Sequence, residues 1–109
     1  MVLMRRALCV LTLAVLCGAA LANETYSDDV PLEEYLRALG AIAPAARDGA
    51  EAYLRAYRAN CGREMKSGQL RRAVADGSGD PVLMGMVRAK HYKDEADLRS
   101  LSKQVGCGR

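Results

Sequence analysis

The stretch PAARDGAEAYLRAYRANCG, residues 44–62, decides the fold. Its apolar side chains recur at spacings of three and four residues, which is the period of one helix face. These positions are Ala46, Gly49, Ala50, Tyr53, Leu54, Tyr57 and Cys61. Glu51 stands four residues before Arg55 on the polar face, a spacing that favours an ion pair. Pro44 and Gly62 are typical first and terminating residues, so the stretch predicts an amphipathic helix from Pro44 to about residue 60.

A shorter helix is expected on the N-terminal side of this stretch. Its apolar stripe consists of Leu32, Tyr35, Leu36 and Leu39, at positions i, i+3, i+4 and i+7. Asp29 is placed to cap the helix, and Pro31 to lie in its first turn. Gly40 and Pro44 should bracket its end.

On the C-terminal side, a helix is expected over about 64–75, followed by the loop 76–79. Asp80-Pro81 has the form of a cap and a first-turn proline, and predicts a further helix. Lys93-Asp94 should break that helix. A last stripe consists of Leu98, Leu101 and Val105, with Gly106 ending it. The sequence therefore predicts an all-α fold, a small bundle of four to five short helices.

Residues 1–22 have the three parts of a cleavable secretory signal peptide. Arg5 and Arg6 form the positive region, residues 7–17 are apolar, and the small residues up to Ala22 form an A-x-A cleavage pattern. A membrane-spanning helix needs about 20 apolar residues, so stable membrane insertion is not expected. The mature chain would be a single small domain, 23–109, that begins with a flexible polar segment, 23–29, and is secreted.

Removal of residues 1–22 leaves two of the four cysteines, Cys61 and Cys107. In an exported protein they are expected to form one disulfide that staples the bundle. The alternative is a bond between two chains, because Cys107 lies near the C-terminus. The intramolecular bond and a monomer are favoured. With no Phe and no Trp, the core must come from aliphatic side chains and five tyrosines.

No motif in the mature chain indicates an enzyme. His91 is the only histidine, and a metal site normally needs several His, Cys or carboxylate ligands. No G-x-S-x-G pattern frames a serine nucleophile, and Gly77-Ser78-Gly79 lacks the spacing of a phosphate loop. We therefore expect no catalytic residues, no bound metal and no cofactor.

Charge is distributed unevenly along the chain. Residues 23–54 hold seven acids and two arginines, whereas residues 55–109 hold twelve Lys or Arg and six acids. The basic side chains either form ordinary solvated helix faces or a patch for an acidic extracellular partner. The candidate patch consists of Arg55, Arg58, Arg63, Lys66, Arg71, Arg72, Arg88, Lys90 and Lys93. Without Arg5 and Arg6 the net charge falls from +3 to about +1, which argues against a nucleic-acid partner.

Three further features leave alternatives open. Asn23-Glu24-Thr25 is a candidate N-glycosylation site, although it adjoins the expected cleavage point. Arg71-Arg72 is either a pair of structural arginines or the cut site of a processed peptide precursor. Met84-Gly85-Met86 suits core packing, or a soft apolar surface of a small carrier of hydrophobic ligands.

The chain resembles the small secreted helical proteins in the saliva of blood-feeding mosquitoes. The likeness rests on the signal segment, the acidic start 23–29, the short helices, and a helix end Tyr53-Leu54-x-x-Tyr57-x-x-Asn60-Cys61 closed by a terminal cysteine. It implies a binding function toward a host or pathogen macromolecule. The sequence thus predicts a secreted, non-enzymatic interaction protein whose partner is an extracellular protein or acidic polysaccharide.

Overall fold

The computed structural model describes residues 27–108, and within that range it contains five helices and no strand. The helices are α1 (Leu32–Ile42), α2 (Pro44–Cys61), α3 (Ser67–Ala75), α4 (Pro81–Tyr92) and α5 (Glu95–Ser102). The predicted all-α fold of four to five short helices is confirmed. The predicted signal peptide and Asn23 lie outside the described residues.

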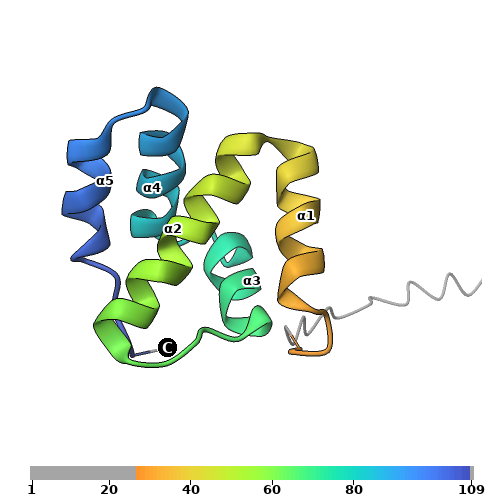
Figure 1. Ribbon diagram of the computed structural model, residues 1–109. Helices are drawn as coiled ribbons and strands as arrows, with labels where there is room; N and C mark the ends of the chain where they lie inside the picture. Colours follow the sequence, from red (N-terminus) through yellow and green to blue (C-terminus); the bar gives the residue numbers. More distant parts are fainter. Residues whose placement is uncertain (1–26, 109) are drawn as a thin grey trace, which may run out of the picture.

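The longest helix, α2, lies in the middle of the bundle (Figure 1). It packs against α1, α4 and α5, and α3 packs against α4. Because α2 has neighbours on more than one side, it buries Ala52 and Ala56 in addition to the predicted stripe. It runs antiparallel to α4 (Figure 1): Pro44, at the start of α2, lines a hollow together with Lys90, near the end of α4, whereas Tyr53, further along α2, is hydrogen-bonded to Asp80, the cap of α4.

The buried apolar side chains form one core to which every helix contributes. Tyr57, Leu70, Leu83 and Met86 are its largest fully buried members. Met65 and Val105 also belong to this core, although both lie outside the helices. Aliphatic side chains and tyrosines thus fill the interior, as the composition requires.

Most of the helix ends follow the sequence signals. Gly62 ends α2 with a positive φ of 71°. Oδ1 of Asp80 accepts hydrogen bonds from the backbone N–H groups of Val82 and Leu83, which caps α4. The expected break at Lys93-Asp94 is also present, and Asp94 accepts a hydrogen bond from Asp97 N–H at the start of α5.

The predicted start of α1 was wrong. Pro31 itself is the N-cap residue and makes no side-chain cap, while the backbone N–H of Asp29 donates to Ser27 Oγ in the preceding turn. The predicted end is confirmed, because the helix stops at Ile42, between Gly40 and Pro44. It ends there because Ala43, which precedes Pro44, has extended backbone angles, and a following proline disfavours the helical conformation.

Two other helices are shorter than their patterns predicted. α3 begins at Ser67 rather than near residue 64. At this start, the backbone N–H of Lys66 donates to Gln69 Oε1 at 3.0 Å. α5 ends at Ser102, so Val105 lies in the segment that follows the helix and is buried there. Both differences shorten a helix without changing which apolar side chains face the core.

The expected disulfide joins Cys61, the last residue of α2, to Cys107, with 5.6 Å between the two Cα atoms. This confirms the intramolecular pairing. Asn60 reinforces the connection, because its Nδ2 donates to the carbonyl oxygens of Ser102 and Val105 at 3.0 Å each. The C-terminal segment is therefore held against the end of α2 by one covalent bond and by hydrogen bonds.

The predicted pair of Glu51 with Arg55 was wrong. Glu51 accepts instead from Nε of Arg47, one turn earlier, at 2.8 Å. Arg47 also reaches Glu33 of α1 at 2.8 Å, so it links α1 to α2. The hydrogen bonds to Glu51 and then to Glu33 raise the pKa of Arg47 above its ordinary value.

Candidate functional site

The structure divides the nine candidate basic residues into two groups. Because α2 and α4 are antiparallel, the end of α2 and the end of α4 lie at opposite ends of the bundle (Figure 1). Six of the residues lie on the second half of α2, the connection that follows it, and α3. This group, called the basic end below, consists of Arg55, Arg58, Arg63, Lys66, Arg71 and Arg72. The same two groups are separate along the sequence, and the structure adds that they lie at different ends of the bundle.

Acidic side chains are scarce in the sequence of the basic end, and the structure brings Asp28 to the start of α3, where its Oδ1 accepts a hydrogen bond from the backbone N–H of Gly68 at 2.9 Å. Residues 55–75 hold six Lys or Arg and a single acid, Glu64. Arg58 forms an ion pair with Glu64 at 2.9 Å, and both side chains are largely exposed. Since exposed pairs of this kind add little stability, the pair leaves Arg58 available to other anions.

Two arginines of the basic end are also bound to the backbone. Arg63 donates to the carbonyl oxygen of Cys107 at 2.9 Å, and its guanidinium carbon lies 5.5 Å from the centre of the Tyr57 ring. Arg71 donates to the carbonyl oxygen of Ser27 at 3.2 Å. These contacts hold two of the charges in fixed positions. They also tie Ser27, in the polar segment before α1, to α3.

The second group consists of Arg88, Lys90 and Lys93, in the last turns of α4 and directly after it. Acids follow at once in the chain, since Asp94, Glu95 and Asp97 lie at the start of α5. The positive charge of this group is therefore offset locally, unlike that of the basic end.

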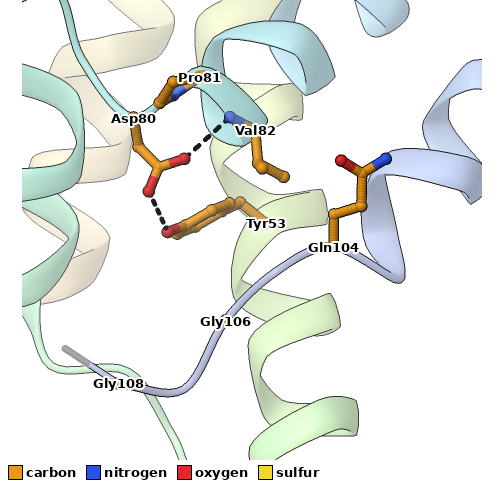
Figure 2. A pocket seen from close by; sticks show the side chains of 7 residues that line it. All are labelled: Tyr53, Asp80, Pro81, Val82, Gln104, Gly106 and Gly108. Atoms are coloured by element: carbon orange, nitrogen blue, oxygen red, sulfur yellow. Dashed lines mark hydrogen bonds between the residues drawn. The ribbon is translucent and has the colours of Figure 1, made fainter.

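A polar pocket of about 390 Å³ lies between α2, the start of α4 and the C-terminal segment (Figure 2). Tyr53 and Asp80 point toward one another there, with Tyr53 Oη donating to Asp80 Oδ2 at 3.2 Å. The other oxygen of Asp80 is the cap of α4. Both oxygens of this carboxylate therefore serve the fold, and among residues 27–108 no serine, cysteine, histidine or lysine lines the pocket beside it.

An apolar groove of about 260 Å³ is formed by α1, α2, α3 and α4. It is lined by Leu39, Ile42, Ala46, Ala50, Val74, Leu83, Met84 and Val87. Of the methionine pair singled out in the sequence, Met86 is fully buried in the core and Met84 lines this groove. Met84 is also partly buried against the core, so both methionines take part in core packing.

The remaining candidates make simple contacts. His91 is exposed and packs edge-on against the ring of Tyr92, with 4.9 Å between the ring centroids. No cluster of three or more His, Cys, Asp or Glu side chains suited to a metal ion occurs among residues 27–108. In the same range no helix combines the length and the apolar character needed to cross a membrane.

Comparison with known proteins gives no relative. No protein family, no curated protein and no solved structure matches this chain. The resemblance to mosquito salivary proteins therefore stays an expectation from the sequence.

Proposed function

We propose that this is a secreted, non-enzymatic interaction protein whose basic end binds an acidic surface of an extracellular macromolecule. The observation that carries the proposal is the excess of charge in residues 55–75, six Lys or Arg against Glu64. Such a surface attracts an acidic partner over a distance and speeds association. If the resemblance to salivary proteins is right, that macromolecule belongs to a host or a pathogen.

The way in which the basic end is held supports binding without large rearrangement. The Cys61–Cys107 disulfide fixes the end of α2, and Arg63 is bonded to the carbonyl oxygen of Cys107. Charges that are positioned before binding lose less conformational entropy when a partner arrives. The basic end is thus suited to a partner with a matching arrangement of acids.

The spread of these charges favours a macromolecule over a small ligand. The six residues occupy two helices and the connection between them, and none lines the polar pocket or the apolar groove described above. Five of the six side chains are exposed and Arg71 is half-buried. An extended, open, charged surface fits an acidic polysaccharide or protein surface, whose own charges are spread out.

The test measures binding to two acidic probes, heparin and poly-glutamate, with the full chain secreted from a eukaryotic host. Reversal of four charges, by Arg55→Glu, Arg58→Glu, Arg71→Glu and Arg72→Glu together, should weaken binding by about a hundredfold or more. The affinity of the unchanged protein should also fall steeply with salt concentration. Far-UV circular dichroism verifies that the variant keeps its helices.

The matched control reverses the other group, with Arg88→Glu, Lys90→Glu and Lys93→Glu in one chain. It should weaken binding by no more than about threefold, because these charges lie at the opposite end of the bundle. Equal losses in the two variants, or no salt-sensitive binding of either probe by the unchanged protein, would overturn the proposal.

The processed-precursor alternative has a separate test, the mass of the secreted product. Arg71 and Arg72 lie inside α3, so a protease would have to unfold that helix before cutting it. We expect a single species that begins at Asn23 and is intact through residues 71–72. Two chains joined through Cys61 and Cys107 would instead support the precursor.

A further inference from the structure

The polar segment before α1 lies against the start of α3. Oδ1 of Asp28 accepts a hydrogen bond from the backbone N–H of Gly68 at 2.9 Å, across 40 positions of the chain. The carbonyl oxygen of Ser27, one residue earlier, accepts from Arg71 at 3.2 Å. Two bonds therefore hold residues 27–29, called the acidic strap below, on a helix of the basic end.

The acidic strap brings negative charge to a part of the basic end that is otherwise positive. The first turn of α3 contains no acid of its own, although a helix start favours negative charge. Asp28 supplies that charge from another part of the chain. Gly68 precedes Arg71 by three residues and Arg72 by four, so its N–H and both arginines lie on one side of α3. The carboxylate is thus held where an acidic partner of the basic end would bind.

The strap is attached to α3 by polar contacts alone. Its three residues, Ser27, Asp28 and Asp29, are all exposed and none is apolar. The contact of Ser27 Oγ with the backbone N–H of Asp29, at 3.2 Å, lies within the strap itself. Because no apolar side chain of the strap is buried, it can leave α3 without opening the core.

We propose that the acidic strap is an intramolecular competitor for the basic end, and that an acidic partner displaces Asp28 from the start of α3 when it binds beside Arg71 and Arg72. The proposal rests on the function proposed above for the basic end. It adds regulation to that function, because occupation of α3 by the strap lowers the apparent affinity for every partner. A partner with closely spaced negative charges replaces the contacts of Asp28 most completely, so the strap favours such a partner over a weakly charged one.

The test compares two variants in which one exposed acid becomes its amide, so that the net charge changes equally. Asp28→Asn keeps an oxygen that can accept from Gly68, but a hydrogen bond without the charge is only about half as strong. The full secreted chain with this change should bind heparin about three- to fivefold more tightly than the unchanged protein.

The matched control is Glu95→Gln. Glu95 is exposed in the first turn of α5, at the other end of the bundle from the start of α3 (Figure 1). This change should alter the affinity for heparin by less than about 1.5-fold. Equal gains in the two variants would show that only net charge matters, and the strap would then be no competitor.

A second measurement follows the strap itself in the complex. Amide NMR spectra of the full chain are recorded with and without a saturating amount of a short heparin oligosaccharide. The signal of Gly68 should shift, and those of Asp28 and Asp29 should move to positions typical of an unstructured chain, because the strap is released. The signal of Ala89, buried on α4, should stay in place. Unchanged signals of Asp28 and Asp29 in the saturated complex would contradict displacement.

The outcomes separate this inference from the function on which it rests. If the fourfold charge-reversal variant loses heparin binding while Asp28→Asn binds like the unchanged protein, the basic end remains the binding surface and the strap is refuted. If neither the unchanged protein nor Asp28→Asn binds heparin or poly-glutamate, both proposals are wrong.

Discussion

The two ends of α2 are held in different ways. At its C-terminal end, the Cys61–Cys107 disulfide and the two hydrogen bonds from Asn60 bind the C-terminal segment. At its N-terminal end, the helix depends on close contact between Gly49 and Val87, and on the ion pairs of Arg47. One end is cross-linked, whereas the other is held by close packing and by the ion pairs of the half-buried Arg47.

The surfaces at the two ends differ as well. The cross-linked end packs its interior around Tyr57 and Val105 and carries exposed charged side chains, among them Arg58 and Arg63, on its surface. An end held by packing keeps apolar surface nearby, and here part of that surface remains open as the groove lined by Ile42 and Val87. The apolar groove thus lies along the first half of α2, whereas the basic end begins in its second half.

The largest expected effect is loss of the disulfide. Cys61→Ser with Cys107→Ser opens a connection across 46 positions, and should lower the free energy of unfolding by about 4 kcal/mol. Urea unfolding followed by circular dichroism measures the change. Reduction of the unchanged protein is the control and should give a similar loss. A loss below about 1 kcal/mol would mean that the cross-linked end is held by its other contacts.

The next effect tests the end held by packing. A Cβ on Gly49 would lie 2.5 Å from the Cα of Val87, so Gly49→Ala must push α2 and α4 apart. We expect a loss of about 1–3 kcal/mol in the free energy of unfolding.

Gly40→Ala is the matched control for this substitution. Gly40 is also inside a helix, but its nearest neighbour would be the flexible side chain of Arg47 at 3.2 Å. Alanine favours helices over glycine by about 1 kcal/mol, so this variant should be unchanged or more stable. Equal losses at the two glycines would show that α2 and α4 are not held by close approach at Gly49.

Much of the fold was predictable because its signals are local. Asp80-Pro81, Gly62 and the apolar stripe through Tyr53 and Tyr57 act within a turn or two of the chain, and each is confirmed. The disulfide was also predictable, since the expected signal peptide leaves only two cysteines.

The features that the sequence did not predict depend on contacts between different helices. Glu51 pairs with Arg47 rather than Arg55 because Arg47 also reaches Glu33 on another helix. Met65 and Val105 are buried outside any helix, where periodicity says nothing. The groove, likewise, needs four helices to form, and no single stretch of sequence contains it.

The smallest effect concerns the hydroxyl group of Tyr57, at the cross-linked end. Tyr57 is fully buried, and its Oη has no hydrogen-bond partner among residues 27–108. A buried hydroxyl without a partner costs about 1–3 kcal/mol relative to water. Tyr57→Phe removes that cost and leaves only a small void. We therefore expect the free energy of unfolding to rise by up to about 1 kcal/mol.

Tyr53→Phe is the matched control, one turn earlier on the same helix. Its hydroxyl donates to Asp80 Oδ2, so the same substitution there should lower the free energy of unfolding by about 0.5–1.5 kcal/mol. Urea unfolding of both variants gives the comparison, and the two changes should have opposite signs. A loss at Tyr57 equal to that at Tyr53 would mean that the Tyr57 hydroxyl is hydrogen-bonded, and that polar bonds hold the cross-linked end even inside its core.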